Sequence, residues 1–344
     1  ANLGALVEMV LHDGKLKFAA GERIGVATGD PRGFTCFEDL WNAFRLQAEN
    51  MMKHVFIQQY VADTLKSKYI ASPLCSMLHD LCMEECKDMH AGPIDGALYL
   101  GFVDTLGFGT AIDSLAAIKK LVFDEKKLTM AELVEATDAD FQEKEAIRQM
   151  CLNAPKYGNG DAYADSIGRD IEELFIHLTR RHKSAFGGEL DVRYVTITAH
   201  IPFGAVLGAT PDGRKAGEPV AEGVSPSQGA DRKGPTASLR SVASTRCGGY
   251  KERAARLLNM KLTPSAVAGR DGIPKLMSVI RTACDLKMWH LQFNIINSQT
   301  LIEAQKNPEK YRNLLVRVAG YSAYFVDLTP QLQNEIIKRT EHGL

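Results

Sequence analysis

Helical segments alternate along this chain with short β-prone runs, and this alternation leaves few fold classes open to it. The predicted helices span residues 1–15, 35–68, 75–90, 111–127, 129–153 (as two shorter helices), 161–184, 248–262, 298–307 and 330–340. Runs of β character joined by Gly and Pro loops begin at about residue 192, and they include 288–296 and 314–330. Helices that alternate with strands are typical of α/β proteins. The pattern alone does not distinguish a barrel from an open sheet.

Length and charge exclude several classes of protein. The chain has 344 residues, of which 45% are hydrophobic, and its 41 Lys and Arg residues nearly balance 42 Asp and Glu residues. A globular protein is expected, with no electrostatic attraction to nucleic acid or to an anionic membrane. No uncharged apolar stretch approaches the roughly 18 residues of a membrane helix, and no signal peptide is expected.

The cysteines predict free thiols rather than disulfides. Seven cysteines, an odd number, are spread without the spacing of a small disulfide scaffold, which favours a reducing cytoplasm. Cys75, His79, Cys82, Cys86 and His90 have spacings that could place them on one helix face as metal ligands. Ligands spread over three turns would span about 16 Å at 1.5 Å per residue, too far to meet at one ion. A buried structural seam is therefore favoured, and no metal site is predicted.

Three other stretches of the sequence are weaker candidates for a functional site. The glycine clusters at 107–110 and 157–161 lack the pattern of a phosphate-binding loop and are interpreted as turns. The Gly- and Pro-rich segment 208–237 is long enough for a functional loop, and the sequence leaves open whether it lines a site. Cys247 is a candidate nucleophile, but an unactivated loop thiol is favoured because no activating neighbour is evident.

One glycine interrupts the β-prone run 314–330. A glycine within a strand weakens it, so Gly320 indicates a bulge, a bend or close approach by another backbone. The surrounding sequence RVAGYSAYF, residues 317–325, resembles the radical loop R-V-x-G-[YF]-[SA]-x-x-F of glycyl radical enzymes of the pyruvate formate-lyase type. Segments 113–122, 154–159, 209–237 and 290–297 are similar to other stretches of the same family. The resemblance covers essentially the whole chain.

The resemblance implies that Gly320 carries the radical. The remaining predicted residues of the glycyl loop are Arg317, Val318, Ala319, Tyr321 and Ser322. A radical on an α carbon is stabilised when that carbon is planar between an amide nitrogen and a carbonyl, a geometry that a Cβ would crowd. The family implies no bound cofactor in the chain. A separate radical S-adenosylmethionine activase removes the hydrogen, and the glycyl radical then oxidises a cysteine to a thiyl that attacks the substrate.

The cysteine loop expected of this family is not found in the chain. None of the seven cysteines lies in a G-C-V-E-like motif, so the chain resembles the carboxyl-terminal half of a catalytic subunit. The amino-terminal half, or a subunit equivalent to it, is the expected partner that supplies the thiyl cysteine. The resemblance implies half of a ten-stranded α/β barrel over residues 1–344, with a glycine radical domain over 300–344. Val316, Val318, Tyr324 and Phe325 are expected to shield the radical as core residues.

The loop 208–237 resembles the eliminating members of the family most closely. An oxygen-sensitive lyase or dehydratase of anaerobic metabolism is therefore predicted, cleaving a C–O, C–N or C–S bond in a small polar substrate. The alternatives are a decarboxylase, a formate-lyase-type acyltransferase, a fumarate-adding synthase and a non-catalytic radical-replacement subunit. A homo-oligomer in the cytoplasm or in a bacterial microcompartment is expected.

Residues 196–204 resemble a barrel strand that faces the substrate. They make Thr198, His200 and Phe203 candidate substrate contacts. For His200, a paired core histidine is the favoured alternative.

Overall fold

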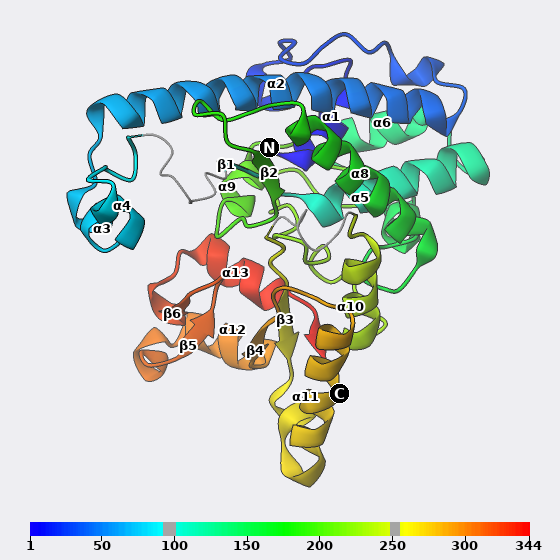
Figure 1. Cartoon of the computed structure of the whole chain (residues 1–344). Coiled ribbons are helices and arrows are strands. Elements are labelled where there is room, and N and C mark those ends of the chain that lie inside the picture. Colours follow the sequence, from blue (N-terminus) through cyan, green and yellow to red (C-terminus); the bar gives the residue numbers. More distant parts are fainter. Residues whose placement is uncertain (92–100, 248–254) are drawn as a thin grey trace.

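The structure, a computed structural model, describes residues 1–91, 101–247 and 255–344 (Figure 1). Its helices in the first half are α1 (Leu3–Leu11), α2 (Phe37–Tyr69), α3 (Pro73–Met77), α4 (Asp80–Glu84), α5 (Phe108–Ile118), α6 (Met130–Asp138), α7 (Glu145–Asn153) and α8 (Ala162–Arg180). In the second half they are α9 (His200–Ala205), α10 (Pro235–Ser244), α11 (Gly269–Asp285), α12 (Ser298–Lys306) and α13 (Pro330–Lys338). The strands are β1 (Gly101–Asp104), β2 (Leu190–Arg193), β3 (Asn259–Leu262), β4 (Gln292–Ile295), β5 (Leu315–Arg317), β6 (Ser322–Tyr324) and β7 (Glu341–His342).

The main strands run parallel to one another. β1 pairs with β2 in parallel, and a parallel bridge between Tyr194 and Arg256 joins the end of β2 to the segment that enters β3. β3 then lies between β4 and β7, and both pairings are parallel. Parallel strands connected through helices confirm the predicted α/β class.

The larger hydrophobic core lies where α1, α5 and α8 pack together, with α2 lying across them at the top of Figure 1. Every residue of α1 and α5 is buried, which explains their unusually apolar sequences. Asn2 caps α1 by accepting hydrogen bonds from the backbone N–H groups of Gly4 and Ala5. Burial of a side chain such as Leu6 or Ile112 stabilises the fold by roughly 1.5–3 kcal/mol.

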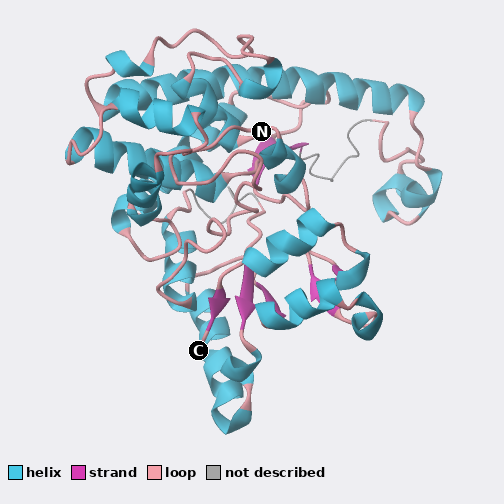
Figure 2. Ribbon diagram, turned by 180° about the vertical axis from the view of Figure 1, so that it is seen from behind, coloured by secondary structure: helices cyan, strands magenta, loops and turns pink. Residues whose placement is uncertain are grey.

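A second, smaller core supports the end of the chain. It contains Leu301 of α12, Val316 of β5, Phe325, and Leu332 and Ile336 of α13. β5 and β6 form an antiparallel hairpin beside these helices, on one flank of the parallel strands in both views (Figures 1 and 2). This core holds the segment with the sequence RVAGYSAYF in place.

Several predicted elements are confirmed. α2 and α12 span nearly the predicted residues, and β4 lies inside the predicted strand 288–296. α13 begins at Pro330, and the hydroxyl of Thr329 accepts a hydrogen bond from the backbone N–H of Leu332. Pro is tolerated at the first helical position because its missing N–H would be unpaired there.

Other predicted elements are wrong. Residues 259–262 form β3 instead of a helix because parallel partners on both sides take up their backbone groups; residues 248–254 lie outside the described part. Residues 196–204 are not a strand, since a turn leads there into α9. α10 and α11 form where no helix was predicted, and α11 tolerates Pro274 inside it.

The predicted helix 75–90 is also wrong, because α3 and α4 are two short helices. The carboxylate of Asp88 accepts hydrogen bonds from the backbone N–H of Ser72 at 2.7 Å and from the Ser76 hydroxyl at 2.9 Å, which folds the segment back on itself. Cys82 is buried, whereas Cys75 and Cys86 are exposed, so these cysteines do not form one buried seam. Within residues 1–91, 101–247 and 255–344, no group of three or more His, Cys, Asp or Glu side chains is placed to hold a metal ion.

In the described parts of the chain, none of the helices combines the length and the apolar character needed to cross a membrane.

Candidate functional site

Gly320 lies at the tip of the β5–β6 hairpin. The tip is closed by a hydrogen bond of 2.9 Å from the Val318 N–H to the Tyr321 carbonyl. Gly320 has a φ of +81°, in the left-handed region that glycine adopts without steric cost. A Cβ at this position would have Leu257 Cδ1 at 4.0 Å as its nearest neighbour, which is ordinary contact. In this structure it is therefore the backbone conformation, not crowding, that favours glycine.

Two amide side chains of β4 hold the tip. Asn294 accepts from the Arg317 N–H at 2.7 Å and donates to the Arg317 carbonyl at 2.6 Å. Gln292 Oε1 accepts from the Gly320 N–H at 3.1 Å and from the Arg317 guanidinium at 3.1 Å. Residues two apart on a strand share a face, which is why both amides reach the same loop. Sequence reasoning included this strand but did not single out these two residues: their spacing predicts a shared face, but no local signal links that face to Gly320.

A buried cluster of charges supports the other side of the tip. Arg339 Nη1 donates to the Val318 carbonyl at 3.0 Å, and Arg339 Nη2 lies 2.8 Å from Glu335 Oε2 and 3.5 Å from Glu222 Oε2. His200 Nε2 lies 3.6 Å from Glu335 Oε1, and all four side chains are at most 9% exposed. Sequence reasoning missed Glu222, which is far from the loop motif in the chain, and also Glu335 and Arg339, which lie outside the motif but have the i,i+4 spacing of a helical ion pair.

The pKa values of the two buried carboxyl groups, Glu222 and Glu335, are shifted in opposite directions. Burial raises the pKa of Glu222, an effect that the charges of Arg339 and His200 reduce. Burial also disfavours ionisation of Glu335, but Arg339 and His200 outweigh it and hold the pKa of this carboxyl below its ordinary value. The arrangement therefore keeps Glu335 charged and paired with the arginine that binds the hairpin.

The predicted loop residues differ in exposure. Val318 and Ala319 are buried, Arg317 is half-buried, and Tyr321, Ser322 and Gly320 itself are exposed. Val316 and Phe325 are buried as expected, but Tyr324 is 45% exposed, so its prediction as a core residue is wrong. The hairpin packs through one face only, against Leu257, β4 and α13, and this leaves Tyr324 on the open side.

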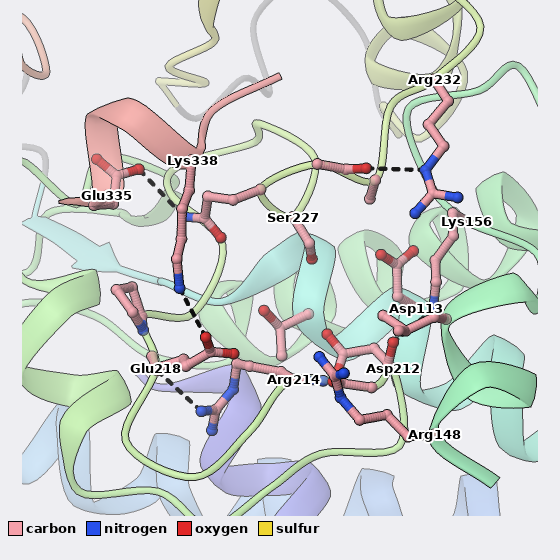
Figure 3. A pocket seen from close by; sticks show the side chains of 17 residues that line it. Asp113, Arg148, Lys156, Asp212, Arg214, Glu218, Ser227, Arg232, Glu335 and Lys338 are labelled. Carbon is pink, nitrogen blue, oxygen red and sulfur yellow. Dashed lines mark hydrogen bonds and ion pairs between the residues drawn. The ribbon is translucent and has the colours of Figure 1, made fainter. Parts of the chain in front are cut away.

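The three predicted substrate contacts do not meet in one cavity. His200 is fully buried against Glu335, whereas Thr198 is half-buried in the turn before α9 and Phe203 is 48% exposed. None of the three lines the pocket of Figure 3. His200 is buried with its Nε2 3.6 Å from Glu335, at ion-pair distance but without a hydrogen bond of normal geometry within the described residues. The roles of His200, Thr198 and Phe203 stay predictions.

The thiol of Cys247 has no activating environment. Its Sγ lies 3.3 Å from the Arg169 carbonyl. Burial and the nearby carboxylates of Glu172 and Glu173 raise the pKa of this thiol to about 11. A raised pKa suppresses the nucleophilic thiolate, so the structure agrees with the reading of Cys247 as an unreactive thiol.

Together, a parallel α/β scaffold and a hairpin that presents a left-handed glycine at its tip define the architecture of a glycyl radical protein. Comparison with known families agrees: residues 1–204 match the model of the pyruvate formate lyase-like family, and residues 220–326 match the glycine radical model. The chain belongs to the pyruvate formate lyase-like family of glycyl radical proteins.

Individual relatives point to the lyase and dehydratase members. The chain is 52% identical over 341 residues to the isethionate sulfite-lyase of Oleidesulfovibrio alaskensis, covering 99% of this chain and 41% of that protein. It is 39% identical over 342 residues to the trans-4-hydroxy-L-proline dehydratase of Clostridioides difficile, covering 99% of this chain and 42% of that protein. This chain thus spans about two fifths of the length of these relatives.

A solved structure confirms the predicted fold. The crystal structure of hydroxyproline dehydratase from Clostridioides difficile with trans-4-hydroxy-L-proline bound superimposes with a TM-score of 0.93 at 39% identity. The superposition covers 99% of this chain and 43% of that one. The fold is therefore part of a glycyl radical enzyme barrel.

Proposed function

We propose that this chain is the radical-bearing portion of a glycyl radical lyase that cleaves a carbon–heteroatom bond in a small polar molecule. Gly320 stores the radical. The observation that carries the proposal is the hairpin tip, where Gly320 has a left-handed backbone and its N–H is held by Gln292. The 52% identity to an isethionate sulfite-lyase favours C–S cleavage of a small hydroxyalkyl sulfonate over C–O cleavage.

The chemistry proceeds by hydrogen transfers. A separate activase removes one hydrogen atom from the Gly320 α carbon, and the glycyl radical later takes a hydrogen atom from a cysteine thiol. The thiyl removes hydrogen from a substrate carbon, the bond to the neighbouring heteroatom breaks, and the thiol returns a hydrogen atom to the product radical. The roles of Gln292, Asn294 and Arg339 are to fix the loop so that Gly320 meets the thiol reproducibly.

The thiyl cysteine comes from outside this chain. The side chains found against Gly320 are those of Gln292 and Leu257, and none of the seven cysteines is among them. Since the chain spans 41% of the sulfite-lyase relative, we propose that the remaining region, in the same polypeptide or in a partner, supplies the cysteine and the base. A radical S-adenosylmethionine activase, homo-oligomer formation and a cytoplasmic or microcompartment location belong to the same proposal.

An activity assay tests this function. The chain is combined anaerobically with its complementary amino-terminal region and an activase, and sulfite release from isethionate is compared with dehydration of trans-4-hydroxy-L-proline. The proposal expects sulfite release in the wild type and none with Gly320→Ala. Turnover that persists in Gly320→Ala contradicts the assignment of the radical, and dehydration without sulfite release contradicts C–S cleavage.

A further inference from the structure

A polar cavity lies on the side of α13 that faces the helical body. It has a volume of about 260 Å³ and is lined by residues of α5, α7, the segment after α7, the loop 208–237 and α13 (Figure 3). Charged side chains from these separate elements point into it, among them Asp113, Arg148, Lys156 and Arg232. Gln292 and Leu257, which contact Gly320, do not line this cavity, but Glu335 of the buried charge cluster does, so the cavity adjoins the support of the hairpin.

Most of the acidic groups at the cavity already have partners. Glu218 pairs with Lys338 at 2.8 Å. Asp212 Oδ1 accepts from the Thr210 hydroxyl at 2.6 Å and from the Arg214 N–H at 3.3 Å. Lys338 therefore balances the charge of Glu218, whereas Asp212 is held by neutral donors and keeps its negative charge in the cavity.

Three cations keep free donor groups. Arg148 Nε donates to the Gly213 carbonyl at 3.0 Å and its Nη1 pairs with Glu145 Oε1 at 3.3 Å, while Arg232 Nε donates to the Gly229 carbonyl at 3.2 Å. Each guanidinium keeps at least one terminal nitrogen that makes no hydrogen bond with the described residues. Lys156 Nζ donates to the carbonyls of Cys151 and Asp212 at 2.8 and 2.9 Å, which leaves one of its three hydrogens. Unused hydrogen-bond donors of three cationic side chains therefore remain at the cavity.

One buried group in the cavity is also incompletely paired. Asp113 is fully buried, and its Oδ1 accepts from the Tyr157 N–H at 2.7 Å. Its Oδ2 and the hydroxyl of the neighbouring Ser227 are both shielded from solvent, and neither makes a hydrogen bond of normal geometry within the described residues. Burial raises the pKa of this carboxyl to about 7 despite the attraction of Lys156, so near neutral pH it can donate a proton to a hydrogen bond. An unpaired buried polar group is costly and points to a missing partner.

We propose that this cavity binds a small oxyanion, held by the guanidinium groups of Arg148 and Arg232 and by the ammonium group of Lys156. Planar guanidinium groups suit oxyanions because their donors match two oxygens at once. The protonated form of Asp113 supplies a further donor. Since α13 also lines the cavity, a bound oxyanion would tie the segment that supports the Gly320 hairpin to the helical body.

Calorimetric titration of the 344-residue chain tests the site. Sulfate, sulfite and phosphate are titrated separately, with chloride at equal ionic strength as the comparison. Saturable binding of at least one oxyanion is expected, without a matching effect of chloride. Sulfite alone would identify a product-like ligand, whereas sulfate and phosphate binding would identify a general oxyanion site; both outcomes support the proposal.

Variants locate the binding. Arg148→Gln and Arg232→Gln should each weaken binding about tenfold or more, the usual scale for losing a hydrogen bond to a charged group. Arg312→Gln is the matched control because Arg312 pairs with Glu309 on the exposed surface, away from the cavity. Circular dichroism confirms that each variant is folded. No saturable binding to the folded wild type, or undiminished binding in both cavity variants, overturns the proposal.

Discussion

Gln292 Oε1 accepts a hydrogen bond of 3.1 Å from the backbone N–H of Gly320, and so fixes the candidate radical residue to the first residue of the parallel strand β4. The same oxygen accepts from the Arg317 guanidinium, at the start of the loop. A radical centre that must meet a thiol repeatedly needs such fixed geometry, because small displacements of reacting atoms slow a reaction sharply. The first prediction concerns this contact.

Gln292→Ala should release the hairpin tip. Loss of the two hydrogen bonds is expected to lower the free energy of unfolding by about 1–3 kcal/mol and to speed hydrogen exchange at the Gly320 amide. Urea unfolding and exchange measured by mass spectrometry check both effects. Gln299→Ala is the control, since Gln299 is exposed and its side chain donates a hydrogen bond to Glu303 on the same helix. Equal exchange at Gly320 in both variants would contradict the role of Gln292.

Arg339→Met should destabilise the chain strongly. The substitution leaves Glu335 and Glu222 buried without the guanidinium that pairs with them, a change that typically costs about 3–5 kcal/mol. Arg312→Met, in an exposed pair, should change the free energy of unfolding by no more than about 1 kcal/mol. Chemical denaturation of the two variants compares their free energies of unfolding. A similar decrease in both variants would count against a structural role for the cluster.

Asp113 should make the stability depend on pH. Its pKa is about 7 in the folded chain and near 3.8 in an unfolded one, so the folded state binds more protons between these values. The stability that this group contributes is therefore complete below about pH 4 and is lost as the pH rises through about 7. In Asp113→Asn this loss should be absent, whereas Asp327→Asn should retain it. Denaturation at a series of pH values measures how the free energy of unfolding changes with pH. The same pH dependence in Asp113→Asn as in the wild type would refute the prediction.

Air should cut the activated protein at Gly320. Oxygen adds to a carbon-centred radical, and breakage of the backbone at that residue would separate residues 321–344 from the rest. Intact-mass spectrometry before and after exposure detects the shortened chain. Protein that was never activated is the control and should stay whole. An activated chain that also survives air intact would argue against a radical at this position.

Local signals in the sequence predicted some of this structure well. α13 was placed correctly because Thr329 and Pro330 mark its start, and such caps act within one helical turn. β3 was mistaken for a helix because its short sequence NMKL has no strong β preference, and only pairing with β4 and β7 decides its state. Gly320 was found from its motif. Gln292, however, lies 28 residues away from Gly320, and nothing local links the two.

The buried charge cluster is likewise not predicted by local signals in the sequence. Glu335 and Arg339 lie one helical turn apart, but Glu222 and His200 come from distant parts of the chain and meet them only after the barrel segments and α13 have packed together. His200 was interpreted as a paired core histidine from its residue type, but its partner Glu335 could not be named. Charges that pair across the fold leave no periodic signal in the sequence.

Electron paramagnetic resonance after anaerobic activation tests the central claim most directly. The wild-type chain, assembled with its complementary region and the activase, should give a doublet from the unpaired electron coupled to the remaining α hydrogen of Gly320. Gly320→Ala should lose this doublet, and Gly343→Ala, which alters a glycine without a left-handed backbone or close neighbours, should keep it. A wild type without the doublet, or an unchanged doublet in Gly320→Ala, would show that Gly320 does not carry the radical.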